Sequence, residues 1–218
     1  MSASESEIVL ELVDYRRRVV DLYAGVRQRG VDESAWCWWV EQRERLLASH
    51  SQSALAGIDG SFASPPRYFD YDSTWCVTGQ VELDGGHESS LRLVADDGAD
   101  FSKIATVRFD RLGVEYRLGL YWLRSYGGGL FVPFRDATNG EATYGAGRYV
   151  IDTAKGADLG LRGGRDGADE LLLDFNFAYH PSCAWDPRWQ CPLAPVENHL
   201  DVAVTAGERK PRPLGSES

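Results

Sequence analysis

The residue types best suited to chemistry are concentrated in three segments of the C-terminal half. These segments, residues 131–149, 173–200 and 206–208, interleave aromatic side chains with charged, amide and thiol groups. A half-buried strand normally alternates apolar and polar side chains, and this mixture departs from that pattern. A packed pocket with a polar lining has such a composition, so we expect a small-molecule ligand to bind there.

Acid–base chemistry is predicted in the segment LDFNFAYH. We expect residues 170–177 to form a strand in which Asp174 and Asn176 share one face, turned either to solvent or into a cavity. In the cavity alternative, Asp174 is the natural general base and Tyr179 or His180 is the acid. These three residues are the candidate catalytic residues, and Asn176 is a candidate for holding the ligand.

Arg148 begins an expected strand and is a candidate for binding an anion. An unpaired buried charge is very costly, so a buried arginine needs a carboxylate partner in the protein or an anion on a ligand. Asp136, Asp174 or Glu208 could be that partner, whereas a ligand carboxylate or phosphate is the alternative. The ligand-binding candidates, besides Asn176, are Asp136, Thr138, Tyr144, Arg148, Asn198 and Glu208.

The segment DATNG, residues 136–140, has the chemistry of a turn. Its Asp and Thr side chains can hydrogen-bond to nearby backbone amides, and Asn-Gly suits a tight turn. The turn is either purely structural or part of a ligand site.

Cys183 and Cys191 stand eight residues apart in a proline-rich segment. Paired zinc ligands are usually two to four residues apart, so a site completed by His180 and His199 has little support. A disulfide is sterically feasible but disfavoured in a reducing compartment. We expect free thiols, no metal and no cofactor.

Size and charge exclude several classes of protein. The chain has 218 residues, a net charge of −10 and 43% hydrophobic residues, which is enough for a packed core. An acidic chain is repelled by nucleic acid and by anionic membrane surfaces. It has no apolar run long enough for a membrane helix, and its N-terminus is acidic where a signal peptide is basic. We therefore expect a cytoplasmic protein.

Two helices are predicted at the N-terminus. Apolar residues recur at steps of three and four over residues 7–29, and Gly30 ends that helix. A second helix, begun by Asp32 or Ser34, should extend to about residue 50. Its three tryptophans, Trp36, Trp38 and Trp39, cannot all lie on one face. One of them contacts a loop, the ligand or a second copy in a homo-oligomer, or is simply half exposed.

Alternation with a period of two begins near residue 75 and indicates about eight short strands separated by turns. The fold class predicted is mainly β: an antiparallel β-barrel or sandwich with an N-terminal α-helical extension. We expect the helical extension to cover residues 1–52 and the β domain residues 53–209. Residues 210–218 are expected to be a disordered tail.

Five motifs resemble a known family. They read RYFDYDSTWCVTGQVE, LFVPFRDATNGEATYGAGRY, LDFNFAYHPSCAW, CPLAPVENHL and AGE. In this order, together with the upstream stretch WVEQRERLLASHSQSAL, they resemble the bacterial and archaeal family called domain of unknown function 1684, over roughly residues 36–209. His180 departs from the family's usual asparagine, and Ala54 from its usual proline. The resemblance implies kinship, and the family has no agreed activity.

Two hypotheses about function follow. In the first, the β domain binds a small anionic or polar metabolite in an internal pocket and could convert it by acid–base chemistry. In the second, the chain is a non-catalytic binding or assembly module that uses its Trp-rich helix. The sequence leaves open whether the protein is an enzyme.

Overall fold

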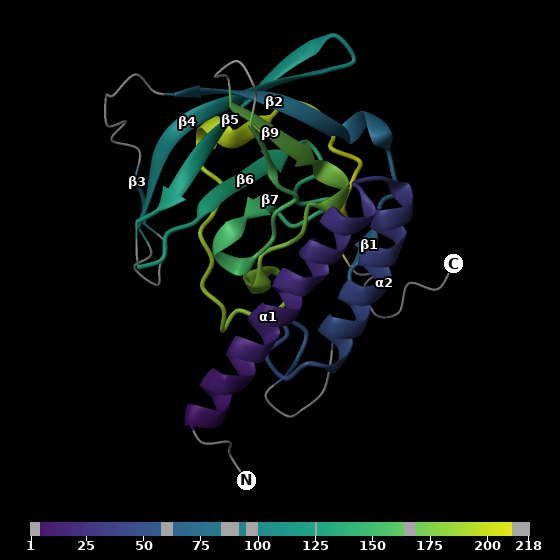
Figure 1. Cartoon of the computed structure of the whole chain (residues 1–218), viewed down its shortest axis with the longest axis vertical. Helices are drawn as coiled ribbons and strands as arrows, with labels where there is room; N and C mark the ends of the chain where they lie inside the picture. The colour runs from purple at the N-terminus through teal and green to yellow at the C-terminus, as the bar shows by residue number, and fades with distance from the viewer. Residues whose placement is uncertain are drawn as a thin grey trace.

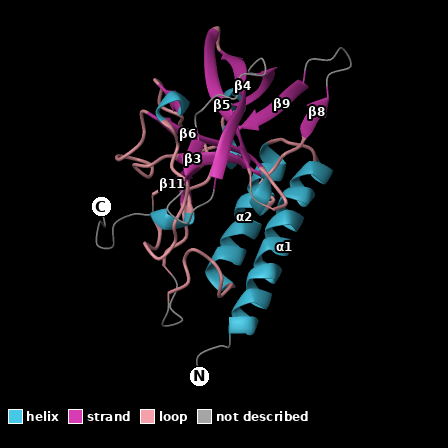
Figure 2. Cartoon of the chain, turned by 90° about the vertical axis from the view of Figure 1, so that its left-hand side faces the viewer, coloured by secondary structure: helices cyan, strands magenta, loops and turns pink. Residues whose placement is uncertain are grey.

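A computed structural model describes residues 5–57, 63–83, 92–94, 100–124, 126–163 and 169–210. Two helices, α1 (Glu5–Arg29) and α2 (Glu33–Ser49), run side by side along one side of the β part (Figures 1 and 2). Gly30 follows α1 with a φ of 90°, and the Asp32 side chain caps α2 by accepting a hydrogen bond from the Ala35 N–H. Both predicted helices are confirmed.

Among the described residues the strands form one nine-stranded sheet and a separate pair. The sheet contains β2 (Cys76–Leu83), β3 (Arg92–Val94), β4 (Asp100–Arg111), β5 (Val114–Leu123), β6 (Leu130–Asp136), β7 (Arg148–Asp152), β8 (Leu161–Gly163), β9 (Asp169–Asp174) and β10 (His199–Leu200). The pair is β1 (Arg67–Tyr68) with β11 (Glu208–Arg209). The main path runs β10-β6-β5-β4-β2-β9-β8, with β3 beside β4 and β7 beside β6.

The sheet is almost wholly antiparallel and curves into a half-barrel (Figure 1). Only the short contact of β10 with β6 is parallel. The predicted fold class, mainly antiparallel β with an N-terminal helical extension, is therefore confirmed. The longest hairpin joins β4 to β5 through Leu112 and Gly113, whose φ values are 55° and 81°. Two consecutive positive φ angles are typical of a tight hairpin turn that matches strand twist.

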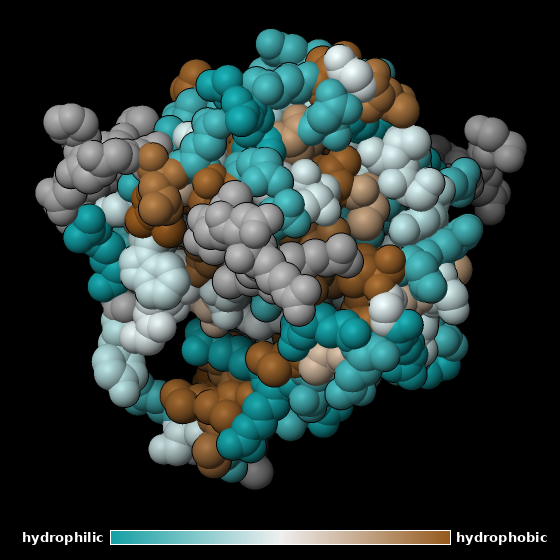
Figure 3. Space-filling model, turned by 45° about the horizontal axis from the view of Figure 1, so that its top comes forward, coloured by the Kyte–Doolittle hydropathy of each residue, from teal (hydrophilic) through white to brown (hydrophobic). Residues whose placement is uncertain are grey.

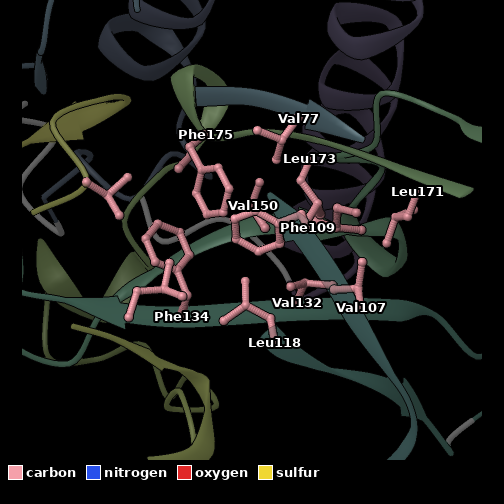
Figure 4. Close-up of a cluster of buried hydrophobic side chains, with 14 of the residues drawn as sticks. Val77, Val107, Phe109, Leu118, Val132, Phe134, Val150, Leu171, Leu173 and Phe175 are labelled. Atoms are coloured by element: carbon pink, nitrogen blue, oxygen red, sulfur yellow. The ribbon is translucent and has the colours of Figure 1, made fainter. Parts of the chain in front are cut away.

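Apolar side chains from facing strands fill the concave side of the half-barrel (Figure 4). The labelled side chains that meet there are Val77, Val107, Phe109, Leu118, Val132, Phe134, Val150, Leu171, Leu173 and Phe175. A second cluster joins the helices to the β part. In it the Trp39 ring, which is fully buried, meets Phe177 with the ring centroids 5.1 Å apart. The helical pair is thus held by a hydrophobic contact of its own.

Of the three tryptophans of α2, Trp39 is fully buried, whereas Trp36 and Trp38 are partly buried and pack against the same cluster. Trp36 is partly buried, and its indole N–H donates to the backbone oxygen of Asn176 at 3.0 Å. Trp38 lies under the guanidinium of Arg29. Trp36 and Trp39 therefore both contact other parts of the same chain.

One expected strand is shorter than its sequence pattern suggests. We expected a strand over residues 170–177, but β9 ends at Asp174 and a 3-10 turn, η3 (Phe175–Phe177), follows. The Asp174 carboxylate accepts a hydrogen bond from the Asn176 N–H at 2.9 Å and so replaces the next backbone pairing of the sheet. The expectation that Asp174 and Asn176 share a strand face was therefore wrong.

Among the described residues after 198, only the short strand His199–Leu200 pairs with the sheet. In the predicted tail, the Lys210 N–H donates to Ala142, and residues 211–218 lie outside the described residues. The predicted division at residues 52 and 53 stays a prediction. Within the described chain, neither helix has the length and apolar character needed to cross a membrane.

Candidate functional site

Arg148, at the start of β7, is completely buried at the centre of a polar network. Its Nη2 donates to the Asp136 carboxylate at 3.0 Å and to the Val204 oxygen at 2.8 Å. Its Nη1 donates to the backbone oxygens of Ala206 and Glu208. Burial lowers the pKa of Arg148, and the Asp136 carboxylate opposes that shift. The protein itself therefore occupies both terminal nitrogens, and Asp136 is the carboxylate that pairs with this arginine.

The Asp136 carboxylate also organises the turn that follows β6. Its Oδ1 accepts hydrogen bonds from the Thr138 N–H at 2.8 Å and from the Thr138 hydroxyl at 2.6 Å. The Thr138 hydroxyl lies 2.8 Å from that of Thr143. This arrangement follows from the turn chemistry of the DATNG segment, and it ties the turn to Arg148.

Glu208, in β11, joins the network from the opposite end of the sequence. Its Oε1 accepts from Nε of Arg43 at 2.6 Å, and its Oε2 accepts from the His180 N–H at 2.7 Å. Burial lowers and the Glu208 carboxylate raises the pKa of Arg43, with a net rise. Gly207 comes before Glu208 with a φ of 76°, and a Cβ there would lie 2.6 Å from the Ala178 oxygen. The AGE motif therefore needs glycine at its centre.

Arg43 was not among the residues expected at the site. Its signal was available in the sequence, because Arg43 shares the apolar face of α2 with Trp39, Leu46 and Leu47. A charged residue on a buried helical stripe needs a partner. What the sequence could not supply was the identity of that partner, which lies 165 residues away.

His180 is a neutral acceptor within this network. Its Nε2 accepts from the Tyr144 N–H at 3.2 Å, so the proton is on Nδ1, which lies 3.9 Å from the Glu208 carboxylate. Burial, followed by the positive charges of Arg148 and Arg43, holds the pKa of His180 well below its usual value. The ring is therefore uncharged at neutral pH.

Asn198 acts as a substitute for a missing backbone pair. Continuing the register of β5 and β6 would set Gly119 opposite Pro133, which has no N–H to donate. The Asn198 amide accepts from the Gly119 N–H at 2.6 Å and donates to the oxygens of Gly119 and Pro133. This side chain thus closes the gap between two strands.

Asp174, like Arg148 at its Nε, has a buried polar atom without a hydrogen-bond partner among the described residues. Its Oδ1 accepts from the N–H and the Nδ2 of Asn176, while Asn176 also pairs with both backbone groups of Asp72. Its Oδ2 is buried and has no hydrogen-bond partner among the described residues. Burial raises the pKa of Asp174 to about 6, although Asn176 and the Cys76 thiol oppose the rise.

Tyr71 lies beside this carboxyl group. Burial and then the negative charge of Asp174 raise the pKa of Tyr71. Tyr179, which was expected to act with Asp174, donates instead to Asp152 at 3.2 Å, and burial raises its pKa. Tyr71 was not expected at the site.

The predicted site residues therefore fall into separate groups. One network links Asp136, Thr138, Tyr144, Arg148, His180 and Glu208. Asp174 and Asn176 form a second group with Asp72, whereas Asn198 and Tyr179 bind other partners. The described residues contain no cluster of three or more His, Cys, Asp or Glu side chains able to hold a metal ion.

The fold and its buried polar network define an antiparallel half-barrel domain with an N-terminal helical pair. Residues 64–209 match the family model described as protein of unknown function DUF1684, and the chain belongs to this family. A solution NMR structure of an uncharacterized protein from Haloarcula marismortui is 33% identical, with a TM-score of 0.57. That match covers 82% of this chain and 94% of the other. No curated protein matches the chain.

Proposed function

We propose that the β domain binds a small polar ligand beside Asp174, through a hydrogen-bond donor of the ligand. The main support is the Oδ2 atom of Asp174, which is buried and has no hydrogen-bond partner within the described chain, while the Cys76 thiol is a weak donor to the same carboxyl group. A buried acceptor without a donor costs about 1–3 kcal/mol. A hydroxyl, amide or amino group of a ligand would remove that cost.

Acid–base conversion of the ligand is the second part of this proposal. A pKa of about 6 keeps Asp174 mostly ionised at neutral pH and gives it the basicity of a general base. Tyr71, whose pKa is raised, stays protonated and would donate a hydrogen bond to the bound ligand. Tyr179 and His180 stay predicted acids, with less support because both already bond to other protein groups.

A polar ligand is better supported than an anionic one. An anion would need Arg148, whose terminal nitrogens already bind Asp136 and three backbone oxygens. Releasing those contacts would leave the buried Asp136 carboxylate without its partner. In this proposal the remaining predicted ligand-binding residues hold the frame of the domain, while Asn176 orients Asp174.

A thermal-shift comparison with matched compound sets tests the proposal. One set contains polyols, amides and primary amines, and the other contains carboxylates and phosphates. A compound that binds the folded protein stabilises it by mass action and so raises its melting temperature. At a ligand concentration one hundred times Kd, the free energy of unfolding rises by about 2.7 kcal/mol. We expect a shift from the first set, and its loss in Asp174→Asn.

The matched control is Glu170→Gln, which makes the same acid-to-amide change at a partly exposed position paired with Gln80. That variant should keep the full shift. The proposal is overturned if no compound of either set shifts the wild type, or if Asp174→Asn responds as the wild type does.

A non-catalytic assembly module is the second candidate function. It is supported by the first half of α1, which exposes the apolar side chains Ile8, Val9, Leu10 and Val13. On the face seen in Figure 3, by contrast, the visible apolar residues lie in separate patches among hydrophilic ones. The Trp-rich helix α2 gives the assembly module less support than α1 does, because Trp39 is fully buried and Trp36 binds the backbone of Asn176.

Light scattering in solution distinguishes the two candidates. For the assembly module, Leu10→Glu should lower the mass of the particle, and Trp38→Ala should do so if α2 takes part. If the wild type is a monomer at all concentrations tested, self-assembly is excluded.

A further inference from the structure

Two cysteines face each other in the proline-rich segment that follows β9, at a place distinct from Asp174. Cys183 lies in the 3-10 turn η4 (Ser182–Ala184), and Cys191 follows eight residues later. The backbone N–H of Cys183 donates to Sγ of Cys191 at 3.4 Å, and the two thiols also hydrogen-bond to each other. Both cysteines are free thiols in this structure.

The two thiols are chemically unequal. The Cys183 S–H donates to Cys191, which lowers the pKa of Cys191 against the opposing effect of burial. The backbone N–H of Cys183 and the positive charge of Lys155 lower it further. The contact with Cys191, and then burial, raise the pKa of Cys183. Because the thiolate is the nucleophile, Cys191 is the attacking sulfur of the pair.

The pair lies close to the protein surface, with Cys183 more exposed than Cys191. Cys191 is 9% exposed and Cys183 is partly buried, so the pair is not sealed in the core. The Tyr144 hydroxyl hydrogen-bonds to Cys183, and the ring of Trp185 lies 5.8 Å from that of His180.

We propose that Cys183 and Cys191 form a reversible dithiol–disulfide centre that exchanges with low-molecular-weight disulfides. The Cys191 thiolate attacks one sulfur of the small disulfide, so that a mixed disulfide forms and one small thiolate leaves. Cys183 then loses its proton and attacks Sγ of Cys191, which releases the second small thiolate. The protein dithiol is oxidised by two electrons and the small disulfide is reduced to two thiols.

Glutathione buffers with a graded ratio of disulfide to thiol test this proposal. The full chain carrying Cys37→Ser, which removes an exposed thiol, is equilibrated in each buffer, acid-quenched, alkylated and analysed by peptide mass spectrometry. We expect the loss of two alkylatable thiols as the ratio rises, with a bond between the peptides of Cys183 and Cys191. The loss should reverse in the reduced buffers.

Single variants establish the order of attack. Cys183→Ser should accumulate a glutathione adduct on Cys191, because the resolving thiol is missing. Cys191→Ser should leave Cys183 largely unmodified, and circular dichroism should show that both variants remain folded. An alkaline-denatured sample of each variant provides the reference in which every thiol reacts.

The proposal is overturned if both thiols stay alkylatable across the whole series while the native spectrum persists. It is also overturned if glutathione adds to Cys183 in Cys191→Ser as readily as to Cys191 in Cys183→Ser. If either variant fails to fold, the wild-type peptide map alone decides, since the bond between the two peptides either forms or does not.

Discussion

Arg148 and Asp174 are both charged, completely buried and located at the end of a strand, yet they differ in how far the protein satisfies them. Both terminal nitrogens of Arg148 bind groups of the chain, and its Nε has no hydrogen-bond partner among the described residues. One oxygen of Asp174 accepts two hydrogen bonds, and the other accepts none among the described residues. Burial of a charge therefore does not by itself mark a functional site. What distinguishes Asp174 is the share of its capacity that is unmet: one of its two oxygens has no partner among the described residues, against one of the three nitrogens of Arg148.

The same contrast separates the two kinds of motif in this chain. The DATNG, GAGRY and AGE segments supply partners to one another, and their glycines and carboxylates hold the C-terminal segment against β7. The segment around Asp174 leaves one carboxylate oxygen without a hydrogen bond among the described residues. In the loop that carries the cysteines, the contact with Cys183 lowers the pKa of Cys191.

The largest effect is expected from Arg148→Met, which removes the cation and leaves the Asp136 carboxylate buried without its partner. Breaking a buried ion pair from one side costs about 3–5 kcal/mol of the free energy of unfolding. Urea denaturation followed by tryptophan fluorescence measures it. Adding Asp136→Asn should restore part of the loss, and a loss no greater than that of a surface substitution would contradict the prediction.

The pH dependence of stability should be next in size and should come from Asp174. Its pKa of about 6 in the folded protein lies above the ordinary 3.8, so the folded state binds the proton more tightly than the unfolded state. The resulting stabilisation is present below pH 4 and is lost as the pH rises through 6, by up to about 3 kcal/mol.

Urea titrations of the wild type and of Asp174→Asn at a series of pH values measure how much Asp174 contributes to the pH dependence of the free energy of unfolding. The variant should lack the decline between pH 4 and 7, because an amide does not titrate. Parallel curves for the two proteins would show that Asp174 titrates normally, and they would remove the contrast with Arg148.

Asn198→Ala should have a moderate effect on the free energy of unfolding. The substitution leaves the buried N–H of Gly119 without an acceptor and two backbone oxygens without a donor. Unsatisfied buried groups of this kind cost about 1–3 kcal/mol. Hydrogen exchange at Gly119 offers a local measurement, and unchanged protection there would show that the strand gap closes without the amide.

The smallest effect is expected from Arg117→Ala, which breaks an exposed ion pair with Glu115. Both side chains are more than half exposed, and their atoms are 3.0 Å apart. Pairs of this kind contribute about 0.2–1 kcal/mol. A loss as large as that of Arg148→Met would contradict the view that burial governs these interactions.

Local features of the fold could be predicted from the sequence. The spacing of apolar residues predicted α1 and α2, and the alternation that begins near residue 75 predicted antiparallel strands such as β5. The DATNG segment also forms a turn, directly after β6. These signals depend on neighbours within a few residues, which is why they can be recognised in one chain.

The sequence by itself determined the helical pair, the antiparallel strands and the family, because periodicity and motif order are local properties. Only the tertiary structure decided that Arg148 binds Asp136, that Arg43 meets Glu208 and that one oxygen of Asp174 stays without a partner. The period-two pattern wrongly placed Asn176 in a strand. The hydrogen bond from its N–H to the Asp174 carboxylate ends β9 at Asp174. Which buried charges meet depends on how segments far apart in the sequence pack together. The spacing of residues along the chain does not show which of these segments lie close in space.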